Sequence, residues 1–341
     1  DAVHKGEPAQ SSNPLGAALA ACVGVAWAFR AALGETTLPR SVRLSLWNVR
    51  GGEHAVAGPR TTGGDLGLVA LIGCGAVGSS MAYLLPLVGL RGRLVLIDRD
   101  TVDDTNLNRS PLFLFADLET KKAEVTAAYL RRVGLEAEPI SMWFDEAVSA
   151  GFVFQDRPDV VVPTANDHGV RHRIQHQVPP LQVYGTTGRD WQAFLGRHIP
   201  LREDCLACRF PVRGPAEPPL ASGTGKVASS STATQTEVDA ALPFLPTAAA
   251  ILAVAELVKA MARPFPVNPN FACLDFRGPL ADLVSVQRDA SVTCLCRQQA
   301  DVWTRLNGAT RFADSLGRQA PDARARLAGV VGADEPEPTG S

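Results

Sequence analysis

Apolar and polar residues along the chain follow a pattern that predicts strands separated by helices. Apolar runs with the length of buried strands lie at 68–72, 93–97 and 159–162, and 136–141 is a further candidate strand. A glycine-containing turn at 73–79 opens onto a helix, and helical spacing recurs at 120–133 and 168–178. Strands that alternate with helices are typical of a parallel sheet covered on both faces. We therefore predict an α/β fold with a Rossmann-like, doubly wound, mainly parallel sheet.

The two ends of the chain add elements of other kinds. Asn13-Pro14 starts an Ala-rich helix through about Leu33, and Arg30 interrupts its apolar run, so a buried helix is expected rather than a membrane span. The alternation at 41–49 predicts a half-buried strand, and 51–67 reads as a loop. After a strand at LQVYGTTG, residues 245–262 predict a helix, and FACLDF and PLADLVSVQ predict strands.

Composition shifts suggest three regions. Residues 1–60 form an N-terminal helical and strand extension, 61–300 the main α/β domain, and 301–341 a C-terminal helical segment with a disordered tail beyond Gly332. Within the second region, 209–240 is rich in Pro, Gly, Ser and Thr, and we expect it to be a long mobile crossover loop.

Overall composition excludes some classes of function. The chain is 46% hydrophobic and 20% charged with a net charge of -2, which is ordinary for a globular protein and argues against a nucleic-acid or anionic-membrane binder. No basic start and no cleavage site flank the first apolar run, so no secretory signal is predicted. We expect a cytoplasmic protein.

A glycine motif after the first apolar strand indicates nucleotide binding. Gly73, Gly75 and Gly78 form GxGxxG between a strand and a helix. This spacing permits a tight turn, a close approach of phosphate to the backbone, and close packing of the helix. Asp98 ends the second strand, where a carboxylate can bind ribose hydroxyls. On this motif alone, a nicotinamide- or flavin-dependent oxidoreductase is the default.

The residues that follow favour ATP instead. Asp100, Asn106, Arg109 and Lys122 form an ordered polar set after Asp98. Attack on an α-phosphate needs cations that neutralise the phosphoryl oxygens; Arg109 can bind two of them, and Lys122 supplies a point charge. The alternative, that both are solvated surface charges, fits an isolated pair better than this set.

At this point the sequence resembles the ThiF/MoeB/HesA superfamily of adenylyltransferases, which includes ubiquitin-activating enzymes. The family signature is GxGxxGS, then a D-x-D-x-V-x-x-S-N-L-N-R-Q run, then a Lys. The matching residues are Gly73, Gly75, Gly78, Ser79, Asp98, Asp100, Val102, Asn106, Leu107, Asn108, Arg109 and Lys122. Thr105 and Ser110 depart mildly from it, and the likeness covers about 68–300. The resemblance therefore implies that 61–300 is a ThiF-type ATP-binding adenylation domain.

The resemblance implies adenylation, with Mg-ATP, of the C-terminal glycine carboxylate of a ubiquitin-like or sulfur-carrier protein, releasing pyrophosphate. The implied catalytic residues are Arg109, Lys122 and Asp167; the nucleotide would be held by the three glycines with Asp98, Asp100, Asn106, Arg109 and Lys122. The family's T-D-N run reads Thr164-Ala165-Asn166-Asp167 here, with Arg171 following. Either Asp167 takes the magnesium after a small backbone shift, which we favour, or the site is weakened.

Two cysteine pairs suggest a metal. Cys205 with Cys208 and Cys294 with Cys296 supply four thiolates, enough for a closed, structural tetrahedral Zn²⁺ site. The second pair is CxC, where CxxC is commoner in the family. The alternative is four thiols without metal.

The cysteine that many relatives use for a thioester has no counterpart between Arg209 and Ala272; KVASSSTATQT stands there instead. Three accounts remain open. The enzyme only adenylates; or Ser or Ala has replaced a cysteine, and an unmutated form would go on to thioester transfer; or another cysteine serves. Cys22 and Cys273 are expected in the core, and Cys74 is expected to face phosphate.

The N-terminal helix and the helix at 245–262 also resemble ThiF-domain proteins of bacterial ubiquitin-like conjugation systems. This likeness implies a homodimer or pairing with an inactive copy, and a possible conjugating enzyme as partner. Rival functions are adenylation of a peptide or small carboxylate, and a catalytically silent partner subunit, with Asn166-Asp167 as its sign.

Overall fold

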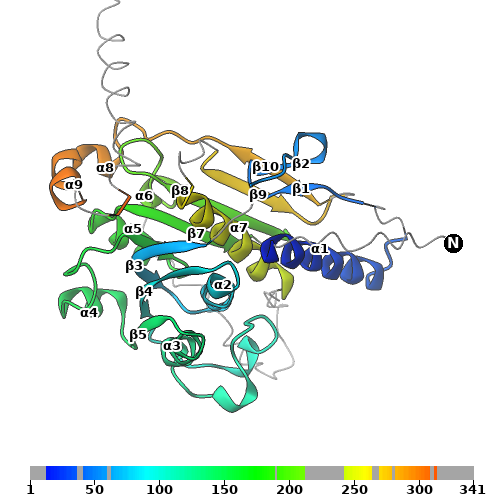
Figure 1. The fold of residues 1–341 in the computed structure, drawn as a ribbon, viewed down its shortest axis with the longest axis horizontal. Coiled ribbons are helices and arrows are strands. Elements are labelled where there is room, and N and C mark those ends of the chain that lie inside the picture. Colours follow the sequence, from blue (N-terminus) through cyan, green and yellow to red (C-terminus); the bar gives the residue numbers. More distant parts are fainter. Residues whose placement is uncertain are drawn as a thin grey trace, which may run out of the picture.

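A single eight-stranded sheet runs through the protein in the order β10-β9-β8-β7-β6-β3-β4-β5 (Figure 1). In this computed structural model, the described residues are 13–36, 41–59, 63–188, 190–211, 242–262, 269–278, 281–307 and 311–312. The strands are β3 (Gly64–Ile72), β4 (Leu90–Ile97), β5 (Glu136–Ile140), β6 (Val160–Pro163), β7 (Leu181–Thr187), β8 (Gln192–His198), β9 (Phe271–Asp275) and β10 (Asp282–Val286). From β5 to β7 the neighbours are parallel, and from β7 to β10 they are antiparallel. The predicted mainly parallel sheet is confirmed.

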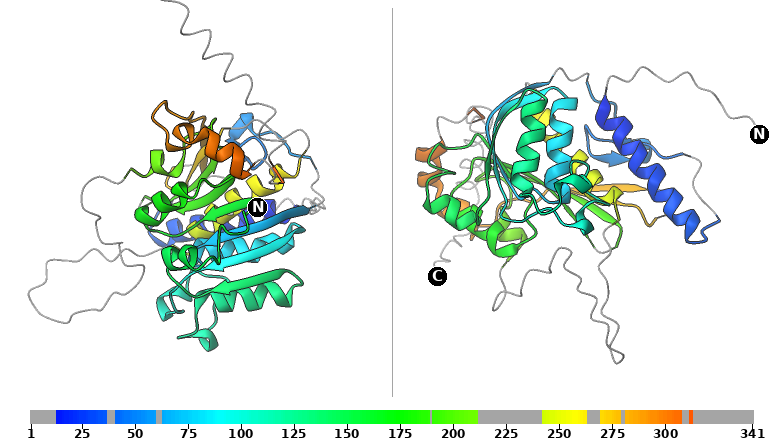
Figure 2. Two further views of the ribbon diagram at one scale, coloured as in Figure 1. Left: turned by 90° about the vertical axis from the view of Figure 1, so that its left-hand side faces the viewer. Right: turned by 90° about the horizontal axis from the view of Figure 1, so that it is seen from below.

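Helices cover both faces of this sheet (Figure 2). On one face lie α2 (Ala76–Leu87), α3 (Lys122–Arg132) and α7 (Phe244–Ala260), with α1 (Pro14–Ala32) against α7; on the other lie α4 (Phe144–Ser149) and α5 (His168–His176). Shorter elements are α6 (Leu206–Arg209), α8 (Leu295–Gln298), α9 (Ala300–Asn307), the 3-10 turns η1 (Gly52–His54), η2 (Asp104–Asn106) and η3 (Phe115–Asp117), and the hairpin strands β1 (Leu44–Ser45) and β2 (Arg50–Gly51).

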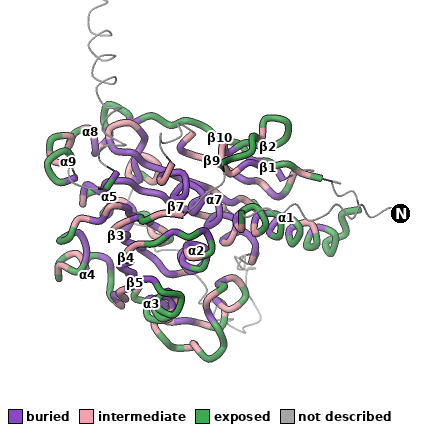
Figure 3. The backbone as a smooth tube through the Cα atoms, viewed as in Figure 1, coloured by how far each residue is buried: buried purple, intermediate pink, exposed green. Residues whose placement is uncertain are grey.

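The apolar run of β3 explains the two-sided burial. Successive side chains of a strand point to opposite faces. Val69 and Leu71 join the core beneath α2 and α7, whereas Ala70 and Ile72 join the core beneath α4 and α5. Because both faces are covered, the strand is apolar throughout, and the central strands and α7 are buried (Figure 3).

The order of strands places a topological switch point at the carboxyl end of β3. Its neighbour β4 lies on one side and β6 on the other, so the connections diverge there, which is where open α/β sheets bind ligands. The backbone N–H groups of Thr164 and Ala165, just after β6, both donate to the Ile72 carbonyl, each at 2.9 Å. The glycine loop and the 164–167 segment are therefore direct neighbours.

Some predicted elements were wrong or missed. The expected strand at 41–49 is only β1, because Ser45 Oγ accepts hydrogen bonds from the backbone N–H groups of Trp47 and Asn48 and turns the chain. Positive φ at Val49 completes the reversal. Strand β8 and helix α4 were not predicted. The crossover segment 212–241 and the tail beyond Gly332 lie outside the described residues.

Helix α1 is buried on one side only. Asn13 Oδ1 caps it by accepting from Leu15 N at 3.1 Å. Leu15, Leu19 and Val23 pack toward α7, while Val25 stays 42% exposed. By length and composition alone, α1 is the one described helix that could cross a membrane, and about a third of its most apolar window is buried here.

Candidate nucleotide site and cysteine cluster

The glycine loop has the geometry that phosphate binding requires. Gly73 has φ +100°, and a Cβ there would lie 2.6 Å from Ala165 N, so only glycine fits. A Cβ on Gly78 would collide with the Gly73 carbonyl, which explains the close packing of α2. Gly75 is the N-cap of α2 and has open space where its side chain would be. A ligand can approach the helix N-terminus through that space.

Asp98 is held against this loop by backbone hydrogen bonds. Its carboxylate accepts from Cys74 N at 2.6 Å and from Asp100 N at 2.9 Å. Burial raises the pKa of Asp98 despite these bonds and the nearby charge of Lys122. Cys74 is fully buried, and burial together with Asp98 raises its thiol pKa. The expectation that Cys74 faces phosphate is therefore wrong: its side chain points into the core.

Lys122 and Asp100 form an ion pair beside Asp98. Lys122 begins α3, and its Nζ lies 3.4 Å from Asp100 Oδ2, while its N–H donates to the Asp100 carbonyl at 2.9 Å. The Lys122 side chain is buried and reaches the edge of the sheet from the first turn of its helix. The structure thus brings Asp98, Asp100 and Lys122 together, as the sequence predicted.

Arg109 and Asn106 lie on the turn that follows. The Arg109 guanidinium is half-buried, and its Nη1 donates to the Thr105 carbonyl at 2.5 Å. Burial lowers the pKa of Arg109, an effect that the charge of Asp103 opposes. Asn106 Oδ1 accepts a hydrogen bond from Asp103 N at 3.1 Å, and this bond closes the η2 turn.

Asp167 caps α5. Its Oδ1 accepts from Val170 N at 2.9 Å, and Asn166 beside it is exposed. Arg171 is buried and donates to the Ala165 carbonyl at 3.0 Å, which fixes the chain after β6. Thr164 and Ala165 connect this segment to the glycine loop, and the magnesium role of Asp167 remains a prediction.

Sequence reasoning missed one pair at the same edge. The Arg99 guanidinium lies 3.4 Å above the Trp143 ring, directly after β4 and β5. Trp143 is 45% exposed although it is a large apolar residue. The signal in the sequence was a tryptophan two residues after the expected strand at 136–141, for which no role was predicted.

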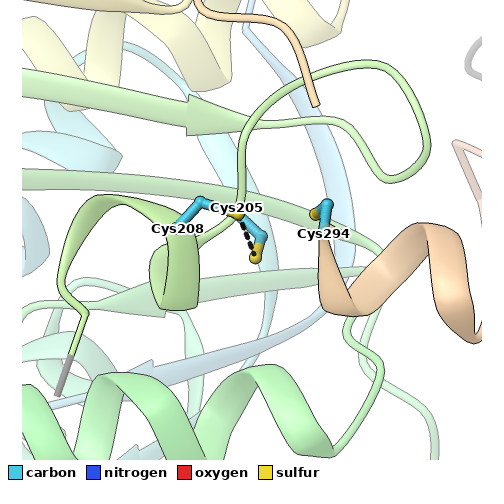
Figure 4. A group of neighbouring side chains, drawn as sticks. All are labelled: Cys205, Cys208 and Cys294. Carbon is cyan, nitrogen blue, oxygen red and sulfur yellow. Dashed lines mark hydrogen bonds between the residues drawn. The ribbon is translucent and has the colours of Figure 1, made fainter. Parts of the chain in front are cut away.

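The four cysteines gather as predicted, beyond the carboxyl end of β8. That end pairs with the start of β7 and so lies away from the glycine loop, which follows the carboxyl end of β3. Sulfur atoms of Cys205, Cys208 and Cys294 lie within 4.8 Å of one another (Figure 4), and Cys296 Sγ lies 3.0 Å from Cys294 Sγ. Cys205 and Cys208 come from the turn into α6, and the other two from the start of α8.

The donor set fits a zinc ion. Zn–S bonds of about 2.3 Å at tetrahedral angles separate sulfurs by about 3.8 Å, and Cys205 and Cys208 are 3.6 Å apart. Hydrogen bonds from Cys205 and Cys296 lower the pKa of Cys294, so one thiolate is already favoured in the cluster. Such an ion would pin α8 to the segment that follows β8.

Buried His198 lies at the end of β8 near this cluster. Its Nδ1 is 3.0 Å from the Glu203 carbonyl, and its Nε2 has no hydrogen-bond partner among the described residues. Burial lowers its pKa to about 4. The folded chain therefore stays unprotonated here where the unfolded chain, with a histidine pKa of about 6.5, takes up a proton.

This difference makes stability depend on pH. The part of the unfolding free energy that comes from neutral His198 is complete above pH 6.5 and is lost as the pH falls toward 4. The free energy of unfolding is therefore expected to be about 1 kcal/mol lower at pH 5.5 than at pH 7.5. Urea unfolding at the two pH values measures it. His198→Gln is expected to lose that part of the dependence; an unchanged dependence would contradict the assignment.

Comparison with known proteins places this geometry in a family. Residues 67–296 match the ThiF family, which is more than half of the chain. The chain is 30% identical over 204 residues to the uncharacterized protein y4jF of Sinorhizobium fredii, covering 58% of this chain and 38% of that protein. It is also 30% identical over 155 residues to the SAMP-activating enzyme E1 of Haloferax volcanii, covering 42% and 53%.

Solved structures show the same fold. Escherichia coli MccB, crystallised with AMPCPP and MccA, superposes with a TM-score of 0.50 at 18% identity, covering 67% of this chain and 66% of that one. The matched part of the chain spans about two fifths of the length of y4jF and about half of the length of the SAMP-activating enzyme.

Proposed function

The chain belongs to the ThiF family, and on that premise we propose that it adenylates the C-terminal carboxylate of a ubiquitin-like or sulfur-carrier protein. In this reaction a carboxylate oxygen attacks the α-phosphorus of ATP, the bond to pyrophosphate breaks, and an acyl-adenylate forms. The observation that carries the proposal is the meeting of Asp98, Lys122 and the glycine loop at one edge of the sheet.

Each residue has a role that follows from its position. The α2 N-terminus and Gly75 receive phosphate oxygens, and Asp98 takes the ribose hydroxyls. Lys122 and Arg109 neutralise the charge that grows on the phosphoryl oxygens. Mg²⁺ would shield the phosphates, with Asp167 as its nearest candidate ligand. The names of two relatives support this proposal. One is the SAMP-activating enzyme E1, and the other is the adenylyltransferase and sulfurtransferase MOCS3 of Mus musculus.

Trp143 and Arg99 would carry the adenine ring. Adenine in doubly wound sheets lies over the strands next to the glycine loop, where this stacked pair presents a flat surface. Trp143→Ala is expected to raise the KM for ATP about tenfold, because base stacking is worth about 1–3 kcal/mol. Steady-state kinetics should show kcat little changed and Trp143→Phe close to wild type. An unchanged KM in the alanine variant would remove the adenine from this position.

ATP–pyrophosphate exchange tests the function. Labelled pyrophosphate should enter ATP only when Mg-ATP and a Gly-ending carrier protein are both present. A carrier shortened by its last glycine is the control. Exchange with a short peptide or small carboxylate but with no carrier would replace the proposed substrate.

A silent partner subunit is the second candidate. Asp167 Oδ1 is engaged in the cap of α5, and Asn166 takes the place where relatives have aspartate. A silent subunit would bind ATP and catalyse no exchange with any carrier.

A further inference from the structure

Two histidines on α5 lie side by side, away from the nucleotide edge. His172 and His176 are one helical turn apart, so their side chains share a face of the helix. Their ring centres are 5.1 Å apart, and His176 is exposed to solvent. The opposite face, with Val170 and Ile174, is buried against the sheet and fixes the rotation of the helix. The proposed adenylation uses neither imidazole.

The spacing of the rings suits a transition-metal ion. Metal–nitrogen bonds of about 2.1 Å place two imidazole nitrogens about 3.3 Å apart, a separation that rings at this distance can reach. Partial burial and the neighbouring His176 lower the pKa of His172. The ring is therefore neutral at neutral pH, which is the form that binds metal.

The same pair faces the cysteine cluster across one cavity. A cavity of 730 Å³ is lined by both histidines and by Cys208. Cys208 is only half-buried, whereas Cys205, Cys294 and Cys296 are fully buried. Asp204 in the same wall is already paired with Arg209 and Arg288, so it does not compete for a cation. Cys208 is thus the partly exposed member of the cluster, and it shares a cavity wall with the two histidines.

We propose that His172 and His176 form a second divalent transition-metal site, which captures the ion and passes it to the cysteine cluster through Cys208. In the transfer, metal–nitrogen bonds break as metal–sulfur bonds form, and the thiol protons leave to water. No electron is exchanged. Water fills the remaining coordination positions at the histidine site. The site is independent of the adenylation chemistry.

Two measurements on folded, purified protein test both steps. Its zinc content is first measured, and Ni²⁺ is then titrated by calorimetry. Wild type is expected to bind one Ni²⁺ per chain beyond the cluster, and His172→Gln/His176→Gln, which lacks both imidazole ligands, is expected to lose this binding. Next, Cd²⁺ is added and the cadmium–thiolate absorption follows metal entry into the cluster. The double variant should fill more slowly than wild type.

His54→Gln is the matched control, since His54 is an exposed histidine on the remote hairpin segment. It should behave as wild type in both measurements. Thermal unfolding checks that the double variant is folded, and single variants replace it if it is not. Ni²⁺ binding that survives the double change, or cadmium entry at the wild-type rate, overturns the proposal.

Discussion

Arg109→Ala is expected to lower ATP–pyrophosphate exchange by about 10²–10³-fold, the usual effect of removing one donor aimed at developing charge. Arg109 lies on the turn that follows Asp98, and under the proposed function its guanidinium binds two phosphate oxygens. In the alanine variant Lys122 would still supply positive charge. Exchange rates at saturating carrier measure the effect.

Two variants control for structure and for charge. Arg109→Lys keeps the charge without the two-pronged geometry and should fall between wild type and Arg109→Ala. Arg132→Ala removes an exposed arginine from the last turn of α3 and should leave exchange unchanged. If Arg109→Ala exchanges at the wild-type rate, the phosphate role of Arg109 is wrong.

Arg197→Met is expected to lower the free energy of unfolding by about 3–5 kcal/mol, because it removes the cation that pairs with buried Glu203 and one of the two that pair with buried Glu256. Arg197 donates to Glu203 and, at 2.9 Å, to Glu256, and all three are buried. Burial opposes the charge on Arg197, yet the two carboxylates raise its pKa above the ordinary value. Glu256 also pairs with Lys259 on α7.

Denaturant unfolding with Arg277→Met as control checks this expectation. Arg277 pairs with Asp190 at 2.6 Å, but both side chains are more than half exposed, so its loss should cost under about 1 kcal/mol. Equal losses in the two variants would mean that the Arg197 network does not hold β8 to α7.

The parallel half of the sheet could be predicted because its strands are buried on both faces. A strand such as β3 reads as an unbroken apolar run, and glycines mark where it turns into α2. The run at 41–49 gave a misleading alternation, since the Ser45 hydroxyl bends the backbone by a local hydrogen bond. Strand β8 carries glycine, arginine and histidine, whose burial depends on partners distant in sequence such as Glu256.

Some residues of the candidate site could likewise be predicted from the sequence, and others could not. Asp98, Lys122 and the glycines were predictable because they lie beside one another in a fixed strand–turn–helix order. Cys74 was misjudged because a loop position does not reveal which way its side chain points. Neither did the sequence show that Arg99 stacks on Trp143, since β4 and β5 become neighbours only in the folded sheet.

The most direct test of the adenylation proposal is the mass of the carrier protein after reaction. A Gly-ending carrier incubated with this protein, Mg-ATP and pyrophosphatase should gain one AMP at its C-terminal carboxylate. Hydroxylamine should displace the AMP and leave the carrier with a C-terminal hydroxamate. Arg109→Ala should form the same product about 10²–10³-fold more slowly. A carrier that keeps its original mass while the wild-type protein binds ATP would contradict adenylation and point to a silent subunit.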